Sequence, residues 1–351
     1  MKVLSIIITI LIFGIIVMIH EGGHFIAAKK CGVMVEEFAI GMGPKLWGKQ
    51  KGETFYSIRL FPIGGYCKML DEDKEATSER GFNSVSVWKR MIIVLAGVFM
   101  NFVLAIFISS IIIMFTGYGE NTLYEVSPQS HASNAGLQVG DEIIEINGSS
   151  VNLANDFRFR LEQRKTENVN IVYKRNGEIF ETSANIKAGE KLGVAFNYKT
   201  PLFSDEIDGF EKVGFFETIK AGFWESIYMI KITFYGLSEL VSMNVSLNDM
   251  AGPIGLTTVV DDVYEQSMQI GIWSMVLSMA NIAALLSANL GVMNLLPIPA
   301  LDGGRFIFLI VEAIRRKPIP PEKEGFVHFI GFVILMGLGI IVAFNDVFKL
   351  L

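Results

Sequence analysis

The sequence has little cysteine, little charge and no excess of positive charge. Only two of the 351 residues are cysteines, Cys31 and Cys67, and their spacing fits neither a disulfide framework nor a pair of metal ligands. We expect two free thiols that pack as small apolar groups. The formal net charge is -6 and no domain carries clustered Lys and Arg, which argues against a phosphate-binding surface. No nucleic-acid partner is therefore expected.

A cleavage site is also missing near the N-terminus. The apolar run from Val3 to Ile19 follows one lysine and looks like a signal peptide, but no small-residue cleavage motif comes after it. Cleavage at this point would also remove the H-E-G-G-H sequence at positions 20–24. The run is therefore predicted to be a retained transmembrane span.

Apolar residues are what the chain has in excess. Hydrophobic residues make up 51% of the sequence and the mean hydropathy is +0.44, which is too apolar for an ordinary soluble enzyme. A transmembrane helix needs about 20 mainly apolar residues. Four segments approach that length, at residues 3–25, 91–116, 271–296 and 326–344. We predict a polytopic α-helical membrane protein with about four transmembrane helices, in contact with the lipid bilayer.

Basic residues gather in two of the loops between these segments. The loop that follows the first span and the loop that follows the third are both rich in Lys and Arg, so the positive-inside bias places them in the cytoplasm. Both chain termini are then extracytoplasmic. The first and third spans both run from outside to inside, so the sequences at their ends should meet at the same cytoplasmic depth.

The H-E-G-G-H sequence is the clearest chemical motif. Residues four apart in a helix lie on one face, so His20 and His24 can share a single zinc ion. Glu21 can then reach a water on that ion, whose pKa falls to about 7, and can carry its proton to a leaving amine. Buried histidines are more often satisfied core residues, and an isolated match leaves that alternative open. Ionisable residues at the end of an apolar span usually mark a site, which favours a membrane-embedded metal centre.

Residues 38–66, between the first two spans, are rich in glycine and aromatics and carry a turn signal at Gly48–Gly52. We expect a membrane-associated β-hairpin that packs beside the active site, because non-helical backbone at membrane depth needs protein or a wet cavity around it. Its edge, expected on the strand Phe55–Leu60, could pair with an extended substrate. An ordinary cytoplasmic hairpin is the alternative.

Residues 117–200 turn polar, with short alternating runs and Asn-Gly turns at Asn147 and Asn176, which predicts a small β-rich domain outside the membrane. Within it, Ala132–Gly148 follows the order A-G-L-x-x-G-D-x-I-x-x-I-N-G. This segment resembles the PDZ family, whose members bind extended peptides by strand addition, and this implies a gate or a peptide reader. An inert β-module is the alternative.

Residues 201–268 link this domain to the third span. Apolar residues recur there at steps of three and four: Phe216, Ile219, Phe223, Ile227, Ile230, Phe234, Leu237 and Val241. The pattern predicts an amphipathic helix that lies on the outer membrane surface. Ala251–Gly255 is expected to make a turn into the third span.

The third span ends in N-L-L-P-I-P-A-L-D-G-G, residues 294–304. Pro297 and Pro299 stop the helix and leave an acid, Asp302, at membrane depth. Catalytic zinc usually takes three protein ligands and leaves one position for water. Asp302 is therefore the best candidate for the third ligand, and a helix cap is its alternative role.

These motifs together resemble the site-2 protease family of intramembrane metalloproteases, in its bacterial RseP-like branch. The resemblance rests on H-E-G-G-H, a G-x-G at residues 41–43, the PDZ-like segment and residues 294–304, in that order along almost the whole chain. It implies zinc bound by two histidines and an aspartate, a glutamate as general base, and substrate contacts from an asparagine and the two glycines. These residues are, in that order, His20, His24, Asp302, Glu21, Asn294, Gly41 and Gly43.

The resemblance also implies a domain organisation and a reaction. The expected domains are a first membrane half at 1–116, one PDZ domain at 117–200, the amphipathic linker at 201–268 and a second membrane half at 269–351. Many relatives carry two tandem PDZ domains, whereas one is legible here. The implied reaction is hydrolysis within or near transmembrane segments, in substrates such as anti-sigma factors or remnant signal peptides. The implied location is the bacterial cytoplasmic membrane, with the active site toward the cytoplasm.

Two other classes of protein fit parts of the sequence. A membrane-anchored PDZ scaffold could hold a structural metal, but a structural zinc needs no base such as Glu21. A zinc protease that clips unfolded membrane proteins from the cytosolic side usually takes a later Glu as its third ligand. The motif around Asp302 disfavours that reading.

Overall fold

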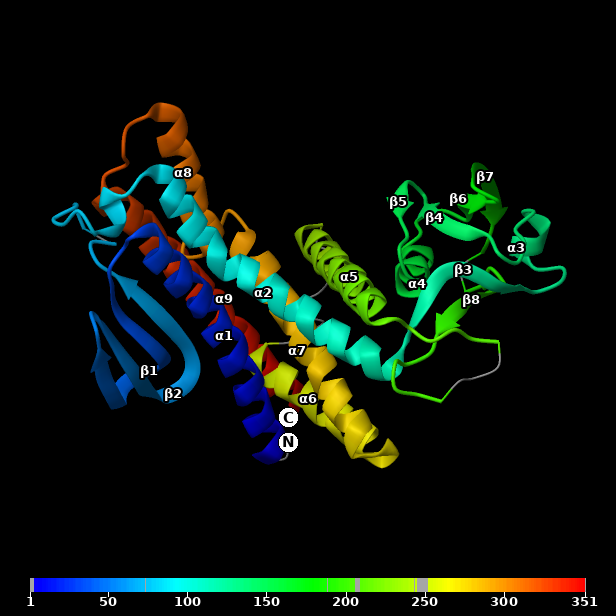
Figure 1. The fold of residues 1–351 in the computed structure, drawn as a ribbon, viewed down its shortest axis with the longest axis horizontal. Coiled ribbons are helices and arrows are strands. Elements are labelled where there is room, and N and C mark those ends of the chain that lie inside the picture. Colours follow the sequence, from blue (N-terminus) through cyan, green and yellow to red (C-terminus); the bar gives the residue numbers. More distant parts are fainter. Residues whose placement is uncertain are drawn as a thin grey trace. The chain divides into compact units, whose positions relative to one another are not determined.

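The computed structural model describes residues 3–72, 74–187, 189–205, 209–242, 244 and 252–350. The chain divides into two compact units, residues 1–105 with 229–351 and residues 106–228. The elements of Figure 1 are α1 (Val3–Cys31), β1 (Val35–Lys51), β2 (Thr54–Met69), α2 (Val87–Thr116), β3 (Tyr118–Val126), α3 (His131–Asn134), β4 (Glu142–Ile146), β5 (Ser149–Ser150), α4 (Ala154–Glu162), β6 (Asn168–Arg175), β7 (Glu178–Asn185), β8 (Val194–Lys199), α5 (Phe215–Val241), α6 (Pro253–Ile270), α7 (Ile272–Leu295), α8 (Asp302–Arg315) and α9 (Pro321–Leu350).

Four helices among the described residues are long and apolar enough to cross a membrane. They are α1, α2, α7 and α9, and each coincides with a segment expected from the sequence. The prediction of a polytopic membrane protein with about four spans is confirmed at this level. Their surfaces carry many exposed large apolar side chains, as lipid-facing helices require.

Two further helices of the first unit were not expected. The segment before α7 is the 18-residue helix α6, whereas the sequence suggested a turn from Ala251 to Gly255. Ala251 itself lies outside the described residues. Asp346 of α9 explains why α6 begins where it does: its carboxylate accepts hydrogen bonds from the backbone N–H groups of Gly252, at 3.1 Å, and Gly255, at 2.8 Å. A buried carboxylate at a helix N-terminus accepts hydrogen bonds from the free N–H groups there. Its negative charge also interacts favourably with the positive end of the helix dipole. The other additional helix, α8, starts at Asp302.

The hairpin of β1 and β2 packs beside α1 (Figure 1). Residues 37–40 pair with residues 65–68 and also with residues 55–58, which in turn pair with residues 47–50. The segment Phe55–Ile58 therefore has a neighbour on both sides. The expectation that a substrate could pair along Phe55–Leu60 is wrong for this segment, because its backbone groups are already engaged within the sheet. Residues 45–51 and 65–69 are the outermost segments of the sheet, each paired with a strand on one side.

Four contacts fasten the hairpin to α1 and to the chain that follows it. The ring of Phe25 lies 5.3 Å from that of Phe38 and 6.1 Å from that of Tyr56. At the hairpin turn, Glu53 accepts hydrogen bonds from Arg80 and Lys29, and these hold the pKa of Glu53 at about 2. The carboxylate is therefore ionised at neutral pH, and both ends of the hairpin are held.

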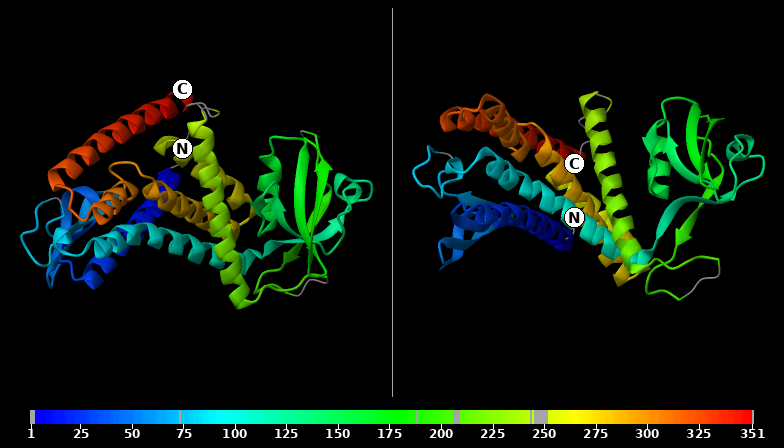
Figure 2. Two further views of the ribbon diagram at one scale, coloured as in Figure 1. Left: turned by 90° about the horizontal axis from the view of Figure 1, so that it is seen from above. Right: turned by 45° about the horizontal axis from the view of Figure 1, so that its top comes forward.

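The second unit contains a six-stranded sheet. Its strands are drawn in green tones in Figure 2. Its strand order is β7-β6-β4-β3-β8, and β5 pairs with β4, so β8 lies at one edge. Both expected Asn-Gly turns occur, with Asn147 and Asn176 in the left-handed conformation that such turns require. Buried apolar side chains of the sheet, α3 and α4 form one core, which contains Leu123, Ile143, Ile146, Phe157, Ile171 and Ile186. The expected amphipathic segment is the continuous helix α5.

Candidate metal centre

The first half of the centre is one face of α1. His20 and His24 are four residues apart, and both are buried, with exposed fractions of 6% and 7%. Their Nε2 atoms lie 3.2 Å apart, and their rings meet edge to face. The helical spacing that the sequence suggested does bring the two imidazoles together.

Two glycines let α1 and α2 approach closely at this level. A Cβ on Gly23 would overlap the carbonyl oxygen of Ala96 on α2. A Cβ on Gly97 of α2 would overlap His24 Nε2 and would lie 2.7 Å from His20 Cε1. The imidazoles therefore occupy space that any larger residue at position 97 would take. Neither steric role could be read from the sequence, because each depends on which helix packs against α1.

Asp302 completes the cluster. It is the first residue of α8, and its Oδ2 lies 3.2 Å from His20 Nε2 and 3.4 Å from His24 Nε2. The N-cap residue of α8 is Leu301, and no side chain caps the helix, so the alternative role of Asp302 as a cap is not supported. The two motifs that lie 278 positions apart in the sequence meet as expected.

The donor atoms of these three residues fit a zinc ion. They lie within 4.8 Å of one another, and Asp302 Oδ2 is buried without a hydrogen bond from any described residue. Ligand atoms at about 2.0–2.2 Å from one tetrahedral centre stand about 3.4 Å apart, close to the spacings found here. Two imidazole nitrogens and one carboxylate oxygen also form a donor set that catalytic zinc commonly takes.

The far sides of the two imidazoles are held by α2. His24 Nδ1 lies 2.8 Å from the carbonyl oxygen of Ile93, so Nδ1 donates and Nε2 keeps its lone pair for a metal. His20 Nδ1 lies 3.2 Å from the side-chain amide of Asn101. If that amide is turned over, its buried oxygen, which otherwise has no hydrogen bond within the described structure, accepts from His20 Nδ1–H. Asn101 was not among the predicted site residues, although an amide within an apolar span is a usable signal.

Glu21 and Asn294 border the cluster. The Glu21 carboxylate hydrogen-bonds the backbone of Cys67 on β2, and a Cβ on Gly65 would lie 3.6 Å from Glu21 Cγ. The amide nitrogen of Asn294 lies 3.4 Å from His20 Nε2. Both expected site residues are therefore beside the histidines, with β2 next to Glu21.

The other expected site residues lie within the hairpin. Gly41 and Gly43 have φ angles of +84° and +85°, and their nearest neighbours are the backbone and ring of Phe61. Glycine is favoured at both positions because residues with a Cβ rarely adopt a positive φ angle. Cys67 is buried, and burial raises the pKa of its thiol, so it stays neutral and does not compete as a thiolate ligand.

The turn from Pro297 to Asp302 places the Asp302 carboxylate beside the two histidines. Ala300 has a φ of +78°, a left-handed conformation that costs an L-residue roughly 1 kcal/mol or more. Gly303 and Gly304 have no room for a Cβ, because the carbonyl oxygens of Leu296 and Ile298 lie against them. The turn therefore folds tightly back onto the start of α8.

Comparison with known proteins gives consistent matches along the chain. The family described as peptidase family M50 matches residues 8–338. A zinc metalloprotease of Clostridium acetobutylicum is 38% identical over 347 residues, which cover 99% of this chain and 98% of that protein. Zinc metalloprotease RasP of Bacillus licheniformis is 31% identical over 427 aligned positions, which cover 97% and 98%. The regulator of sigma-W protease RasP of Bacillus subtilis is 30% identical over 433 positions, which cover 100% of both chains.

Proposed function

The chain belongs to peptidase family M50, the site-2 protease family, and we propose that it cleaves other membrane proteins within or near their transmembrane segments. Membership makes it a zinc metalloprotease of the site-2 type. The observation that carries the proposal is the convergence of His20 and His24, within the apolar helix α1, with Asp302, which follows the apolar helix α7. A metal centre at that place in the fold serves a substrate that is itself in the bilayer.

His20 Nε2, His24 Nε2 and Asp302 Oδ2 are the proposed zinc ligands. When bound, zinc supplies a Lewis acid that lowers the pKa of a coordinated water to about 7. The contact of His24 Nδ1 with Ile93 and that of His20 Nδ1 with Asn101 fix the orientation of the two rings. The protein thus presents the lone pairs of both imidazoles toward Asp302.

Glu21 is the proposed general base. Its position next to His20 and its hydrogen bond to the Cys67 backbone hold the carboxylate at the rim of the cluster. From there it can take a proton from the attacking water and deliver it to the leaving amine. Asn294 is proposed to hydrogen-bond the substrate beside the scissile bond, because its amide lies next to His20.

The substrate is proposed to lie extended along β2. A peptide bond in a helix is shielded by its own hydrogen bonds, so a transmembrane substrate must unwind before it is cut, and its freed backbone groups need partners. The edge formed by residues 65–69 lies next to Glu21 and can supply them by strand addition. Gly41 and Gly43 are proposed to contribute to the same substrate path from within the hairpin.

The β-rich domain is proposed to be a single PDZ domain that reads or gates peptides. Its edge strand β8 and helix α4 border a cavity of about 770 Å³, a place where an extended chain could add to the sheet. The alignments with the two RasP proteins run over 427 and 433 positions, longer than this 351-residue chain. This supports the expectation that some relatives carry an additional domain.

We further propose the orientation given by the basic loops. Both termini and the β-rich domain are extracytoplasmic, and the metal centre lies toward the cytoplasm of a bacterial cell. Substrates in this setting are anti-sigma factors or remnant signal peptides. The Bacillus subtilis relative is named for the regulation of sigma-W, which agrees with the first of these classes.

Trapping substrates with Glu21→Gln tests this function. The purified variant should keep about one zinc and lose hydrolysis by roughly 10²–10⁴-fold, because the amide cannot accept a proton. Asp302→Ala should lose both zinc and hydrolysis. In cells, membrane peptides that accumulate with Glu21→Gln identify the substrates. Cleavage of a helical membrane substrate at the wild-type rate by Glu21→Gln would refute the role of Glu21, and full zinc occupancy in Asp302→Ala would refute the ligand set.

A further inference from the structure

The strained turn that carries Asp302 is held by α9, a helix that contributes no proposed ligand. Ala300, two residues before Asp302, is left-handed, and its backbone N–H donates to His328 Nδ1 of α9 at 2.9 Å. A backbone N–H can only donate, so Nδ1 must carry the lone pair and the ring proton must be on Nε2. His328 therefore fixes the backbone at the one left-handed alanine of the turn.

A glycine brings α9 close enough for this contact. Gly331 lies one turn beyond His328, and a Cβ there would overlap the backbone of Pro299. The ring of His328 also lies 5.7 Å from the ring of Phe308 on α8. The imidazole thus sits between the turn and the helix that Asp302 begins.

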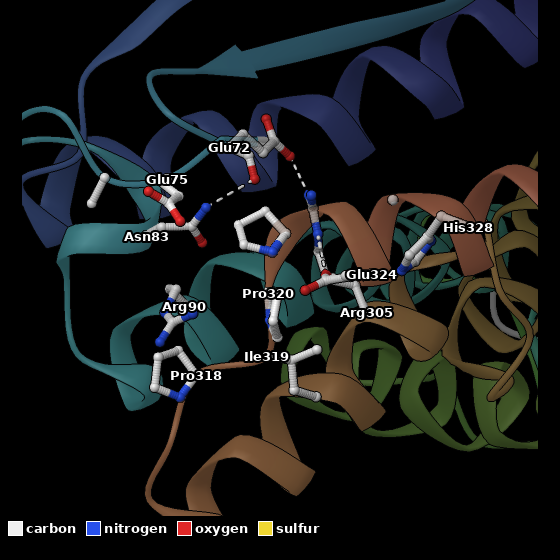
Figure 3. Close-up of a pocket in the computed structure, with 13 residues that line it drawn as sticks. Glu72, Glu75, Asn83, Arg90, Arg305, Pro318, Ile319, Pro320, Glu324 and His328 are labelled. Carbon is white, nitrogen blue, oxygen red and sulfur yellow. Dashed lines mark hydrogen bonds and ion pairs between the residues drawn. The ribbon is translucent and has the colours of Figure 1, made fainter.

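Ion pairs of Arg305 also hold the start of α8 in place (Figure 3). Arg305, three residues after Asp302, pairs with Glu72 of the segment after β2 and, at 3.3 Å, with Glu324 of α9. Glu324 lies one turn before His328, and its Oε1 is 3.9 Å from His328 Nε2. The start of α8 is therefore connected to both α9 and the segment that follows the hairpin.

A cavity of about 390 Å³ borders these groups, and the side chains that line it include Glu72, Arg305, Glu324 and His328 (Figure 3). Ala300 itself is exposed, so water can reach its N–H when the His328 acceptor is lost. Loss of His328 should therefore not leave a buried donor unsatisfied. Substitution of His328 should therefore make the turn at Ala300 more mobile without unfolding the protein.

We propose that His328 is a positioning residue for Asp302. It holds Ala300 in the left-handed conformation and so keeps the carboxylate of Asp302 aimed at His20 and His24. The inference rests on the proposed role of Asp302 as a zinc ligand. In this proposal, α9 and the Arg305 ion pairs together determine how well the protein retains zinc.

Zinc release to a chelator from the purified full-length protein tests the proposal. His328→Phe keeps the ring but removes the acceptor, and zinc release should become about tenfold faster or more. His328→Asn places a side-chain oxygen near the position of Nδ1 and should release zinc at a rate close to that of the wild type. The unfolding temperature of each variant is measured alongside, and it should change little. Equal zinc release from wild type and His328→Phe, or equally fast release from Asn and Phe variants, would overturn the proposal.

Two combined variants separate positioning from a general structural role. In an Asp302→Ala background, His328→Phe should cause no further acceleration, because the group it acts through is gone. Ala300→Gly, which adopts the left-handed conformation without strain, should restore part of the zinc retention lost in His328→Phe. A full additional effect in Asp302→Ala, or no rescue by Ala300→Gly, would contradict the proposal. If His328→Phe does not fold, His328→Leu takes its place in every comparison.

The same measurements distinguish failure of this inference from failure of the proposed function. If Asp302→Ala alone retains zinc like the wild type, the proposed ligand set is wrong. If Asp302→Ala releases zinc rapidly while His328→Phe does not, the ligand set stands and only the positioning role of His328 is wrong.

Discussion

At the scale of single residues, the adjacent glycines of H-E-G-G-H do different things. Gly23 faces α2, where a Cβ would overlap Ala96 O and lie 2.9 Å from Met100 Cγ. Apart from its chain neighbours and the backbone of its own helix, no atom of the described residues lies within 4 Å of the place where a Cβ on Gly22 would stand. The motif therefore contains one glycine required for helix packing and one with open space beside it.

Gly23→Ala should damage the metal centre, whereas Gly22→Ala should not. The methyl group at position 23 must push α1 away from α2 and so separate His24 from Ile93, at an overpacking cost of about 1–3 kcal/mol. Zinc affinity should fall by about tenfold or more, because the ring loses the partner that orients it. Zinc titration and thermal unfolding of the two purified variants measure both effects. The matched control, Gly22→Ala, should bind zinc like the wild type and gain about 0.5–1 kcal/mol of helix stability. Equal zinc affinity and equal thermal stability of the two variants would contradict this account.

The sequence predicted the cluster of His20, His24 and Asp302 because each part has a local or topological signal. Two histidines four apart need only a helix, and the parity of the spans brings the Asp302 segment to the same depth. Gly97 and His328 lack such signals, and the signal for Asn101 is only that it is an amide within an apolar span. Their roles arise only after two helices have packed, so no spacing rule within one segment could find them.

At the scale of elements, the hairpin shows which features local sequence patterns can and cannot predict. The glycines and the turn signal predicted strands correctly, but the strand order within the sheet depends on where the chain bends. Gly41, Gly43 and Gly64 adopt positive φ angles and break the register of β1 and β2. As a result, Phe55–Ile58 became internal and residues 65–69 became the edge beside Glu21. The helix α6 was missed for a related reason, since its Gly-Pro start looked like a turn.

We predict that a trapped substrate lies along the edge at residues 65–69. In a Glu21→Gln protein with Cys31 and Cys67 replaced by alanine, a cysteine at Tyr66 should form a disulfide with a cysteine placed near the cut site of a substrate. A cysteine at Gln50, on the opposite edge of the same sheet, is the control and should not. The physical reason is that strand addition brings the two backbones to within about 5 Å.

Crosslinking at both positions to the same extent would show random contact rather than strand pairing. Crosslinking at Gln50 alone would place the substrate on the far edge. Either result would remove the support for backbone pairing beside Glu21, and the hairpin would then be a passive cover of the centre.

At the scale of the whole molecule, the two halves of the metal centre come from opposite ends of the chain. The H-E-G-G-H helix and the Asp302 turn belong to the same compact unit, while residues 106–228 form the other. A centre divided in this way forms only if the spans are inserted in the right number and direction. The number of apolar spans agrees with the sequence expectation. Their direction rests on the distribution of basic residues and is open to a direct test.

We predict that Lys317, in the segment between α8 and α9, faces the cytoplasm and that Glu178 of the β-rich domain faces outside. Lys317 and Glu178 are both exposed, so a cysteine at either position is accessible to a reagent on its own side of the membrane. In a protein with Cys31 and Cys67 replaced by alanine, a maleimide that cannot cross the cytoplasmic membrane should label Glu178→Cys in intact cells and leave Lys317→Cys unlabelled. Both should react after the membrane is permeabilised, which shows that the second thiol was shielded by sidedness and not by burial. Labelling of Lys317→Cys in intact cells would invert the topology. It would then place Glu21 and the proposed zinc ligands toward the outside, because the Asp302 turn and the Lys317 segment are joined only by α8, which is not among the helices long enough to cross the membrane.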